Sequence, residues 1–300
     1  MSMLVHIKGN TYYIPGAVNI GVIKNEKNPE KSIIIDSGLD DDSGRKILKL
    51  LNDNGMSVGS IINTHSHADH CGGNSFIKSR TDASIYAGSL EKAIIEHPEL
   101  EPFYLFSAAP MKELDVKFLK AKPSAVSHIL EPGSLKIDDI ELSVISLQGH
   151  TPGMMGIAST DGVFFVGDAV FSEDIINKYG LVYLYDVKSA LSTLEYMKSM
   201  KYDYYIPCHG ELVDNISDLV EANIKAVNDV EKEVLKFCTI PADRDRIVSR
   251  IIEKYKIKLT VPQYYLTVAS VSAYLSFMTD SGMLKMSFED NKLKWQRIID

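Results

Sequence analysis

The sequence THSHADHCGG at residues 64–73 is the most informative stretch of this 300-residue chain. It carries three histidines and an aspartate within six residues: His65, His67, Asp69 and His70. Imidazole nitrogens and carboxylate oxygens are the ligands that zinc and similar divalent metals take. Such a density of ligand groups, followed by two glycines, indicates a metal site rather than a set of solvated loop histidines.

The residues on either side of this stretch explain how it could bind metal. Residues 58–63 are short, apolar and β-branched, which predicts a buried strand. Because residues two apart in an extended chain point to the same side, His65 and His67 can bind one metal together. Residues 74–78 predict a helix, and the turn into it displaces the aspartate and the third histidine toward a second metal. The two glycines let the backbone pass close to its neighbours.

Three further clusters follow apolar segments that predict strands. These clusters are GHTPG at 149–153, GDA at 167–169 and CHG at 208–210. His150 would complete the ligands of the first metal and His209 those of the second. Asp168 could give one oxygen to each metal, at the separation of roughly 3.5–4 Å that two-metal hydrolases use. Taken alone, His150, Asp168 and His209 would each be typical of an ordinary loop residue or helix cap. Their order in the chain and their positions at the ends of strands indicate that they belong to one site.

These motifs, in this order, resemble those of the metallo-β-lactamase superfamily, and within it the glyoxalase II-like and lactonase-like hydrolases. The motifs span residues 64–210, and the resemblance implies an α/β fold over roughly residues 3–235. That fold is a four-layer αββα sandwich in which two sheets pack face to face between helices. The metals are expected at one edge of the sheets.

The resemblance implies a role for each ligand residue. One metal would be held by His65, His67 and His150, the other by Asp69, His70 and His209, with Asp168 as the bridge. Two cations sharing one water lower its pKa toward about 7, which yields a hydroxide nucleophile. Asp69 is the expected catalytic residue, which orients this water and carries its proton to the leaving group. Zinc is the expected metal, with iron and manganese as alternatives.

Departures from related patterns narrow the expected activity. β-Lactamases of this fold carry a cysteine where Asp168 stands, which argues against antibiotic hydrolysis. Flavodiiron oxygen reductases carry a glutamate at the position of His67. Quorum-signal lactonases carry a tyrosine three residues after the bridging aspartate, where this chain has Phe171. Cys71 and Cys208 lie beside ligand histidines, but we interpret both as small packing residues.

The last sixty residues differ in character and predict a second domain. We divide the chain into a catalytic domain at 1–240 and a winged-helix-like domain at 241–300. Helices are expected at 242–255 and 268–280, followed by a hairpin of strands 284–287 and 292–295. Residues 241–300 hold ten Lys or Arg against seven Asp or Glu, a net charge of +3. Because the second helix is apolar, packing or dimerisation is favoured over contact with RNA.

Composition limits the remaining alternatives. The net charge of −8 argues against general binding to nucleic acid. Three cysteines without regular spacing predict a reducing, cytoplasmic compartment and no disulfide framework. The N-terminal residues do not form a secretory signal, and no apolar run approaches the ~20 residues of a membrane span. The resemblance to glyoxalase II-like and lactonase-like hydrolases implies a small acyl compound as the partner, and a homodimer is an alternative role for residues 241–300.

The sequence predicts a dinuclear metal-dependent hydrolase of thioesters, esters or lactones. One alternative is a nuclease of the same fold that cleaves RNA or another phosphodiester, and another is a metal-binding regulator without catalysis. Residues 101–124 are rich in aromatic residues and methionine, which is typical of a substrate wall or of a segment packed on the sheet edge. Tyr179, Tyr183 and Tyr185 could line the same cleft.

Overall fold

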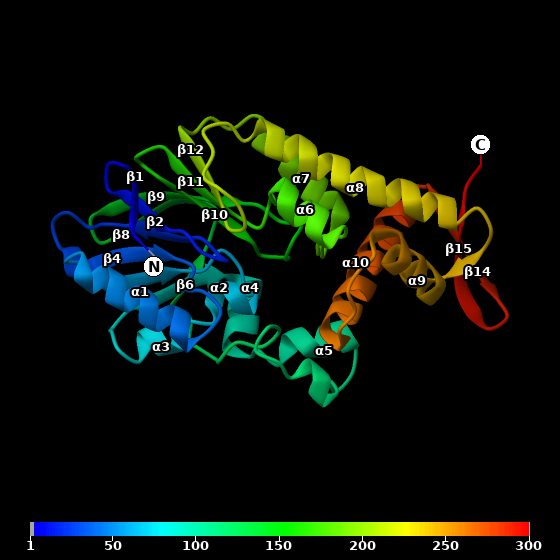
Figure 1. Ribbon diagram of the computed structural model, residues 1–300, viewed down its shortest axis with the longest axis horizontal. Coiled ribbons are helices and arrows are strands. Elements are labelled where there is room, and N and C mark those ends of the chain that lie inside the picture. The colour runs from blue at the N-terminus through cyan, green and yellow to red at the C-terminus, as the bar shows by residue number, and fades with distance from the viewer. Residues whose placement is uncertain (1–2, 300) are drawn as a thin grey trace.

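The computed structural model describes residues 3–299 and contains two β-sheets between layers of helices, with a smaller C-terminal unit at one end (Figure 1). Met1, Ser2 and Asp300, the outer ends of the two predicted domains, lie outside the described residues. The arrangement is the four-layer αββα sandwich that the sequence predicts.

The first sheet contains seven strands whose spatial order follows the chain. Its first four strands pair antiparallel, and the pairs from β4 to β7 are parallel. The strands are β1 (Val5–Lys8), β2 (Thr11–Ile14), β3 (Ile20–Ile23), β4 (Ser32–Ile35), β5 (Val58–Ile62), β6 (Ser84–Gly88) and β7 (His128–Leu130). The strand before the histidine stretch, predicted at residues 58–63, lies within one residue of its predicted bounds.

The second sheet contains five strands in the order β12-β11-β10-β9-β8. Its neighbouring strands pair antiparallel except for β11 and β12, which are parallel. The strands are β8 (Gly133–Ile137), β9 (Ile140–Ser146), β10 (Met155–Ser159), β11 (Val163–Gly167) and β12 (Tyr204–Pro207). The ends of β5, β9, β11 and β12 lead directly into the four ligand clusters.

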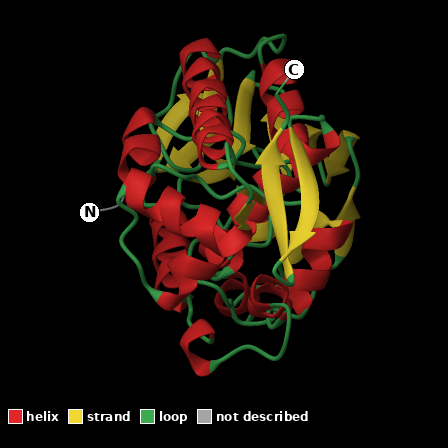
Figure 2. Cartoon of the chain, turned by 90° about the vertical axis from the view of Figure 1, so that its right-hand side faces the viewer, coloured by secondary structure: helices red, strands yellow, loops and turns green. Residues whose placement is uncertain are grey.

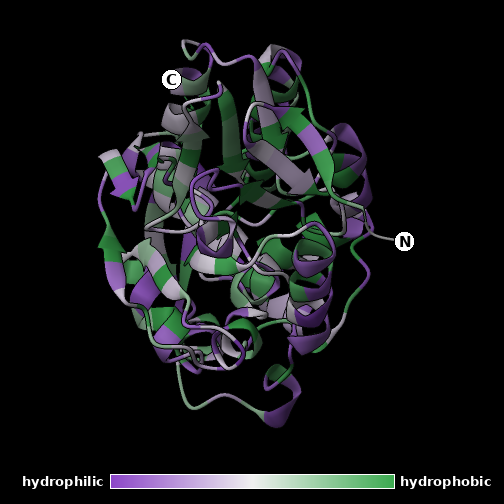
Figure 3. Ribbon diagram, turned by 90° about the vertical axis from the view of Figure 1, so that its left-hand side faces the viewer, coloured by the Kyte–Doolittle hydropathy of each residue, from purple (hydrophilic) through white to green (hydrophobic). Residues whose placement is uncertain are grey.

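Helices cover the outer faces of both sheets. The first sheet packs against α1 (Asp41–Asp53), α3 (Asn74–Lys78) and α4 (Ser89–Glu96), and the second against α7 (Val187–Met197) and α8 (Ser217–Phe237). Shorter elements fill the connections: η1 (Pro29–Lys31), α2 (Ala68–Cys71), α5 (Leu100–Phe106), η2 (Lys112–Leu114) and α6 (Glu173–Tyr179). Figure 3 shows both hydrophilic and hydrophobic residues on the outer helices. This is expected because only one side of each helix faces a sheet and the other faces solvent.

Strand β4 shows why the sheets are buried on both faces. Ile33 and Ile35 point into the core between the two sheets, where they meet residues such as Val144 and Phe165. Ile34 points to the opposite face and packs under the helices of the first layer. Successive side chains of an extended strand point to opposite faces of the sheet, and both faces of this sheet are buried. A continuous apolar run is therefore suitable for β4.

The C-terminal unit consists of β13 (Ala242–Asp243), α9 (Arg244–Tyr255), α10 (Val261–Asp280), β14 (Leu284–Glu289) and β15 (Lys292–Arg297). The three strands form a small sheet in the order β13-β15-β14, and Figure 2 shows the β14–β15 hairpin in front of the helices. Long helix α8 joins this unit to the sandwich (Figure 1). Val230 and Val234 of α8 share one apolar core with Tyr274 and Leu275 of α10.

Three predicted boundaries in this unit need correction. The helix expected from residue 242 begins at Arg244, because Ala242 and Asp243 pair with β15 and Asp243 caps the helix. The helix expected from residue 268 begins at Val261, where the side chain of Thr260 accepts a hydrogen bond from Gln263 N. The hairpin turn is only Asp290-Asn291, both with positive φ, so its strands extend further than predicted.

Two predictions from composition can be compared with the described residues. Cys71, Cys208 and Cys238 are all free and buried. Within residues 3–299, each helix is too short or too polar to cross a bilayer.

Candidate metal centre and substrate cleft

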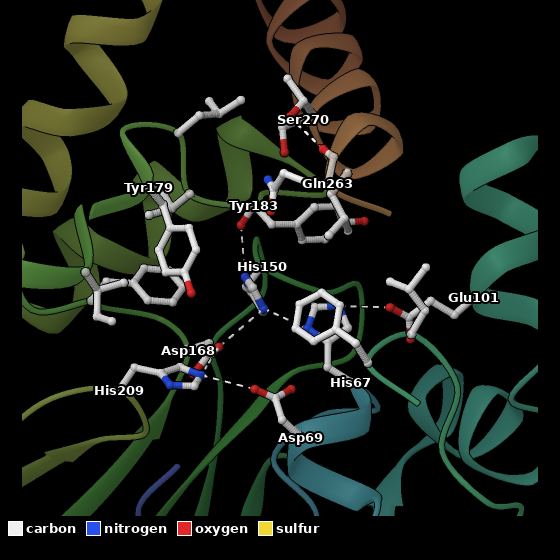
Figure 4. A pocket seen from close by; sticks show the side chains of 18 residues that line it. His67, Asp69, Glu101, His150, Asp168, Tyr179, Tyr183, His209, Gln263 and Ser270 are labelled. Carbon is white, nitrogen blue, oxygen red and sulfur yellow. Dashed lines mark hydrogen bonds and ion pairs between the residues drawn. The ribbon is translucent and has the colours of Figure 1, made fainter. Parts of the chain in front are cut away.

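The seven predicted ligand residues converge at one edge of the sandwich. His65 and His67 follow β5, Asp69 and His70 lie in α2, and the other three follow strands of the second sheet: His150, Asp168 and His209. Gly72 and Gly73 allow α2 to lie against the loop after β4, since a Cβ on either would overlap a carbonyl oxygen of Leu39 or Ser37. We call these seven side chains the floor of the site. Figure 4 labels those of them that line the cleft: His67, Asp69, His150, Asp168 and His209.

The first group of ligands consists of three imidazoles. The distance from Nδ1 of His67 to Nε2 of His65 is 3.2 Å, and to Nε2 of His150 it is 2.9 Å. The three ring nitrogens lie within 4.8 Å of one another. This is the donor set and separation that a cation with three histidine ligands requires.

The second group consists of Asp69, His70 and His209. Nε2 of His70 lies 3.8 Å from Oδ1 of Asp69, and Nε2 of His209 lies 3.5 Å from Oδ2 of the same carboxylate. Asp69 and His70 follow β5 of the first sheet, whereas His209 follows β12 of the second sheet. The site therefore forms only when both sheets are in place.

Asp168 lies between the two groups. Its Oδ2 atom is 3.5 Å from Nε2 of His150, which belongs to the first group. The same atom is 3.6 Å from Nε2 of His70 and 3.4 Å from Nε2 of His209, which belong to the second. One carboxylate thus faces both sets of ligands, as a bridging ligand must.

The outer nitrogens of four floor histidines have partners, which fixes the nitrogen that faces the site. Nδ1 of His65 lies 3.0 Å from Thr64 Oγ1, and Nδ1 of His70 lies 2.8 Å from Oδ2 of Asp36. Nδ1 of His150 donates to the carbonyl oxygen of Tyr183, and Nδ1 of His209 donates to that of Ala17. Partners of this kind orient metal-binding imidazoles and select their tautomer.

His67 is the exception among the five histidines. It presents Nδ1 to the first group, and its buried Nε2 atom has no hydrogen-bond partner among the described residues. The carboxylate of Glu101 on α5 lies 4.0 Å from that Nε2 atom, which is too far for a hydrogen bond. Figure 4 shows this contact at the side of the cleft opposite Asp168.

The electrostatics of the two groups differ. Burial and the neighbouring His150 lower the pKa of His67 to about 3, and burial also lowers the pKa of His65 and that of His150. Burial alone would lower the pKa of His209, but the charge of Asp168 raises it to about 10. The first group thus consists of neutral imidazoles, which is the form that binds metal. The second is a network of opposite charges.

The residues fit a pair of divalent cations. Nε2 of His70 and Oδ1 of Asp168 are buried and lack a hydrogen-bond partner among the described residues. Both atoms belong to groups directed at the centre of the floor. Buried polar atoms left unpaired cost free energy, so a ligand that supplies the missing interactions is expected there. Nitrogen donors with shared carboxylates suit zinc, iron or manganese.

Two buried carboxylates that support the floor were missed at the sequence level. Asp36, at the end of β4, accepts hydrogen bonds from Thr64 N and Thr64 Oγ1 as well as from His70. Glu91 accepts from Ser66 N, and its other oxygen accepts from residues 151 and 153 of the loop that carries His150. An aspartate directly after an isoleucine run was the available signal for Asp36; nothing in the sequence near Glu91 indicated its partners.

A cleft of about 900 Å³, including its opening to solvent, lies above the floor. Its walls come from α5 and the segment after η2, from α6 and the loop that follows, and from α10 of the C-terminal unit. We call these walls the roof. The roof includes Glu101, Phe118 and Leu119 from the aromatic segment that the sequence left as either a substrate wall or a sheet-edge contact. Its position supports the first alternative.

The three tyrosines that follow Asp168 differ in whether they line the cleft. Tyr179 and Tyr183 line the cleft, as predicted, whereas Tyr185 is 55% exposed and does not. Gln263, Leu266, Thr267 and Ser270 of α10 also line it, and the sequence did not indicate this. Such a contribution could not be seen because α10 lies more than 50 residues beyond the last ligand in the chain.

Comparison with known families supports these observations. The sequence model of the metallo-beta-lactamase superfamily matches residues 13–209, a range that contains all seven floor residues. A protein of Aquifex aeolicus described as uncharacterized is 31% identical over 163 residues, which cover 54% of this chain and 69% of the relative. A hydroxyacylglutathione hydrolase of Erythrobacter litoralis is 29% identical over 138 residues, 45% of this chain and 43% of that enzyme.

A crystal structure extends the likeness in fold to the C-terminal unit. A metallo-beta-lactamase family protein from Thermus thermophilus superposes with a TM-score of 0.74 over 99% of this chain and 98% of its own. The sequence identity is 17%, so the likeness concerns the fold alone. The Thermus thermophilus protein therefore shares the fold of the sandwich and that of the C-terminal unit.

Proposed function

The chain belongs to the metallo-β-lactamase superfamily and is a metal-dependent hydrolase, and we propose that it cleaves a thioester, ester or lactone with two divalent metal ions. His65, His67 and His150 would hold one ion, Asp69, His70 and His209 the other, and Asp168 both. The observation that carries the proposal is the position of Asp168 Oδ2, which lies within 3.6 Å of histidine nitrogens from both groups.

The metal ions, when bound, supply Lewis acidity, which lowers the pKa of a water molecule toward about 7 and polarises the oxygen of the scissile carbonyl. The chain's own residues position the reactants. Burial alone would raise the pKa of Asp69, but the charge of His70 lowers it to about 2, so this carboxylate is charged at neutral pH. A charged carboxylate at the cleft can orient the attacking water and carry its proton to the leaving group.

The surroundings of the floor keep these groups in place. Asp36 and Glu91 hold the loops that carry His70 and His150, so the ligand atoms need little reorganisation on metal binding. The walls of the cleft above are mostly apolar. Low polarity strengthens the electrostatic interactions within the site.

Hydrolysis of matched substrates tests the proposal. Zinc-loaded protein should hydrolyse S-acyl thioesters or 4-nitrophenyl esters, and removal of metal with a chelator should abolish the reaction. Activity on single-stranded RNA or bis(4-nitrophenyl) phosphate, with none on acyl compounds, would favour the nuclease alternative. Wild-type rates in metal-free protein would refute the mechanism. The predicted cytoplasmic location and a homodimer formed through residues 241–300 are kept as separate proposals.

A further inference from the structure

The roof of the cleft has no lysine or arginine, among the described residues, that could hold an anionic substrate. The carboxyl groups of the cleft are those of Asp69, Asp168 and Glu101, and the first two belong to the floor. Glu101 is therefore the carboxyl group of the roof, and burial raises its pKa well above the usual range of a glutamate.

Basic residues near the roof are directed elsewhere. Lys117, beside Phe118, donates to Asp40 at 2.9 Å, and Lys120 pairs with Asp115 at 2.6 Å. Lys178 is exposed, and its ammonium group lies 4.9 Å from the centre of the Tyr179 ring. These ion pairs and the stacking contact keep the positive charges outside the cleft.

Glu101 gives one wall of the cleft a defined chemical character. Only 4% of its side chain is exposed, and it has no hydrogen bond to another described side chain. An anionic group placed beside it would lose its hydration without gaining a cationic partner. A neutral group with an N–H or O–H donor could instead bind the carboxyl group.

The remainder of the roof is apolar with a polar strip along α10. The apolar part includes Phe118, Phe171, Ile175, Leu181 and Leu266. Gln263, Thr267 and Ser270 follow one another at helical spacing and face the same cleft (Figure 4). Because Thr267 already donates to the backbone of Gln263, the Gln263 amide is the side chain best able to bind a neutral amide.

From this distribution we infer that the substrate is an uncharged acyl compound whose acyl chain packs on the roof and whose carrier lacks carboxylate or phosphate groups. The C-terminal unit, through α10, sets this specificity. The inference rests on the proposed hydrolysis of acyl compounds and narrows it, since it disfavours carriers such as glutathione. It also gives residues 241–300 a role at the site in addition to packing.

Two matched pairs of compounds test this inference. S-hexanoyl-N-acetylcysteamine and S-hexanoylglutathione are compared as substrates, and the non-hydrolysable S-hexyl thioethers of the same carriers are compared as ligands. Binding of the thioethers is measured by calorimetry on protein stripped of metal, so it does not depend on turnover. The neutral thioether should bind about tenfold more tightly than the glutathione thioether.

Variants locate the origin of the preference. Gln263→Arg places a cation in the cleft and should reduce the preference about tenfold, because a charge-assisted contact to the anionic carrier becomes available. Lys178→Gln and Ser276→Ala, which alter exposed residues outside the cleft, should leave the preference unchanged.

The outcomes separate this inference from the proposed function. Equal or tighter binding of the glutathione thioether by wild-type protein would overturn the inference, as would an unchanged preference in Gln263→Arg. If the thioether preference is found but neither thioester is hydrolysed, the cleft binds as inferred and the proposed thioester cleavage is wrong. If both thioesters are hydrolysed at equal rates and the thioethers bind equally, the proposed function stands and the inference fails.

Discussion

The floor and the roof of the cleft are built on opposite physical principles. The floor consists of buried or half-buried polar side chains, and four of its histidines have outer-nitrogen partners at 2.7–3.0 Å. The roof consists mainly of apolar side chains held by packing, and Phe118 within it is 52% exposed. Directional bonds fix atoms to a few tenths of an ångström, whereas apolar contacts tolerate changes of shape. The floor is therefore suited to set the reaction, and the roof to set the substrate.

The two regions also differ in how they depend on the chain. The floor joins the ends of both sheets and is contained in residues 64–210. The roof takes α10 from the C-terminal unit, which is held by the core that it shares with α7 and α8. If this division is correct, changes in the floor should reduce turnover of every substrate, and changes in the roof should alter which substrate is preferred.

The largest expected effect follows the loss of the bridging carboxylate. Asp168→Ala should reduce kcat by about 10³-fold or more and lower the metal content, because both ligand groups lose a shared donor. Metal analysis and steady-state kinetics on the same preparation measure this. Asp174→Ala on exposed α6 is the matched control. Full activity in Asp168→Ala would remove the basis for treating the floor as one centre.

A substitution in the apolar core that joins α10 to α8 tests whether this core holds the C-terminal unit on the sandwich. Leu275→Ala should lower the free energy of unfolding by about 2–5 kcal/mol, because this side chain is 1% exposed in the core shared by α8 and α10. Denaturant titration gives the value, and the metal content of the folded variant should stay at the wild-type level. The neighbouring exposed substitution Ser276→Ala should change stability by less than about 0.5 kcal/mol. A stable Leu275→Ala protein would show that this core contributes little.

A supporting residue of the floor should have a smaller effect on the metal. Asp36→Asn should weaken metal affinity by about 10–100-fold, since His70 loses the carboxylate that orients its ring. Competition with a fluorescent chelator measures the affinity, and Asp53→Asn on the surface of α1 is the control. Affinity equal to that of wild type would mean that the imidazole is held by its other neighbours.

The smallest effect is expected at the rim of the roof. Phe118→Ala should raise KM several-fold for hexanoyl thioesters and leave kcat nearly unchanged, because the ring provides apolar contact in the ground state and the transition state alike. Acetyl thioesters, whose chains are too short to reach the ring, should show little change. A reduced kcat for both substrates would contradict the separation of floor from roof.

The same division explains what could be predicted from the sequence. The floor was predictable because its ligands are concentrated in short motifs at the ends of apolar strands, as at His65 and His67. Strand β5 and the short helix α3 were predictable because each follows a local pattern in the sequence. Asp36 could have been recognised as a carboxylate after a buried strand, but its partner His70 lies 34 residues away.

The roof could not be predicted in the same way because its members have no common motif. Glu101, Phe118 and Leu266 come together only through the packing of α10 against α5 and the segment after η2. The N-terminus of α10 was also missed: the aromatic and β-branched residues between Val261 and Val268 favour strand as much as helix, and tertiary packing decides between them.

Anomalous diffraction from crystals of the zinc-loaded protein tests the central claim most directly. We expect two peaks per chain, one among the ring nitrogens of His65, His67 and His150 and one beside Asp69, His70 and His209, with Asp168 in contact with both. A single peak, or a peak whose neighbours lie outside these seven residues, would contradict the two-metal site and the proposal built on it.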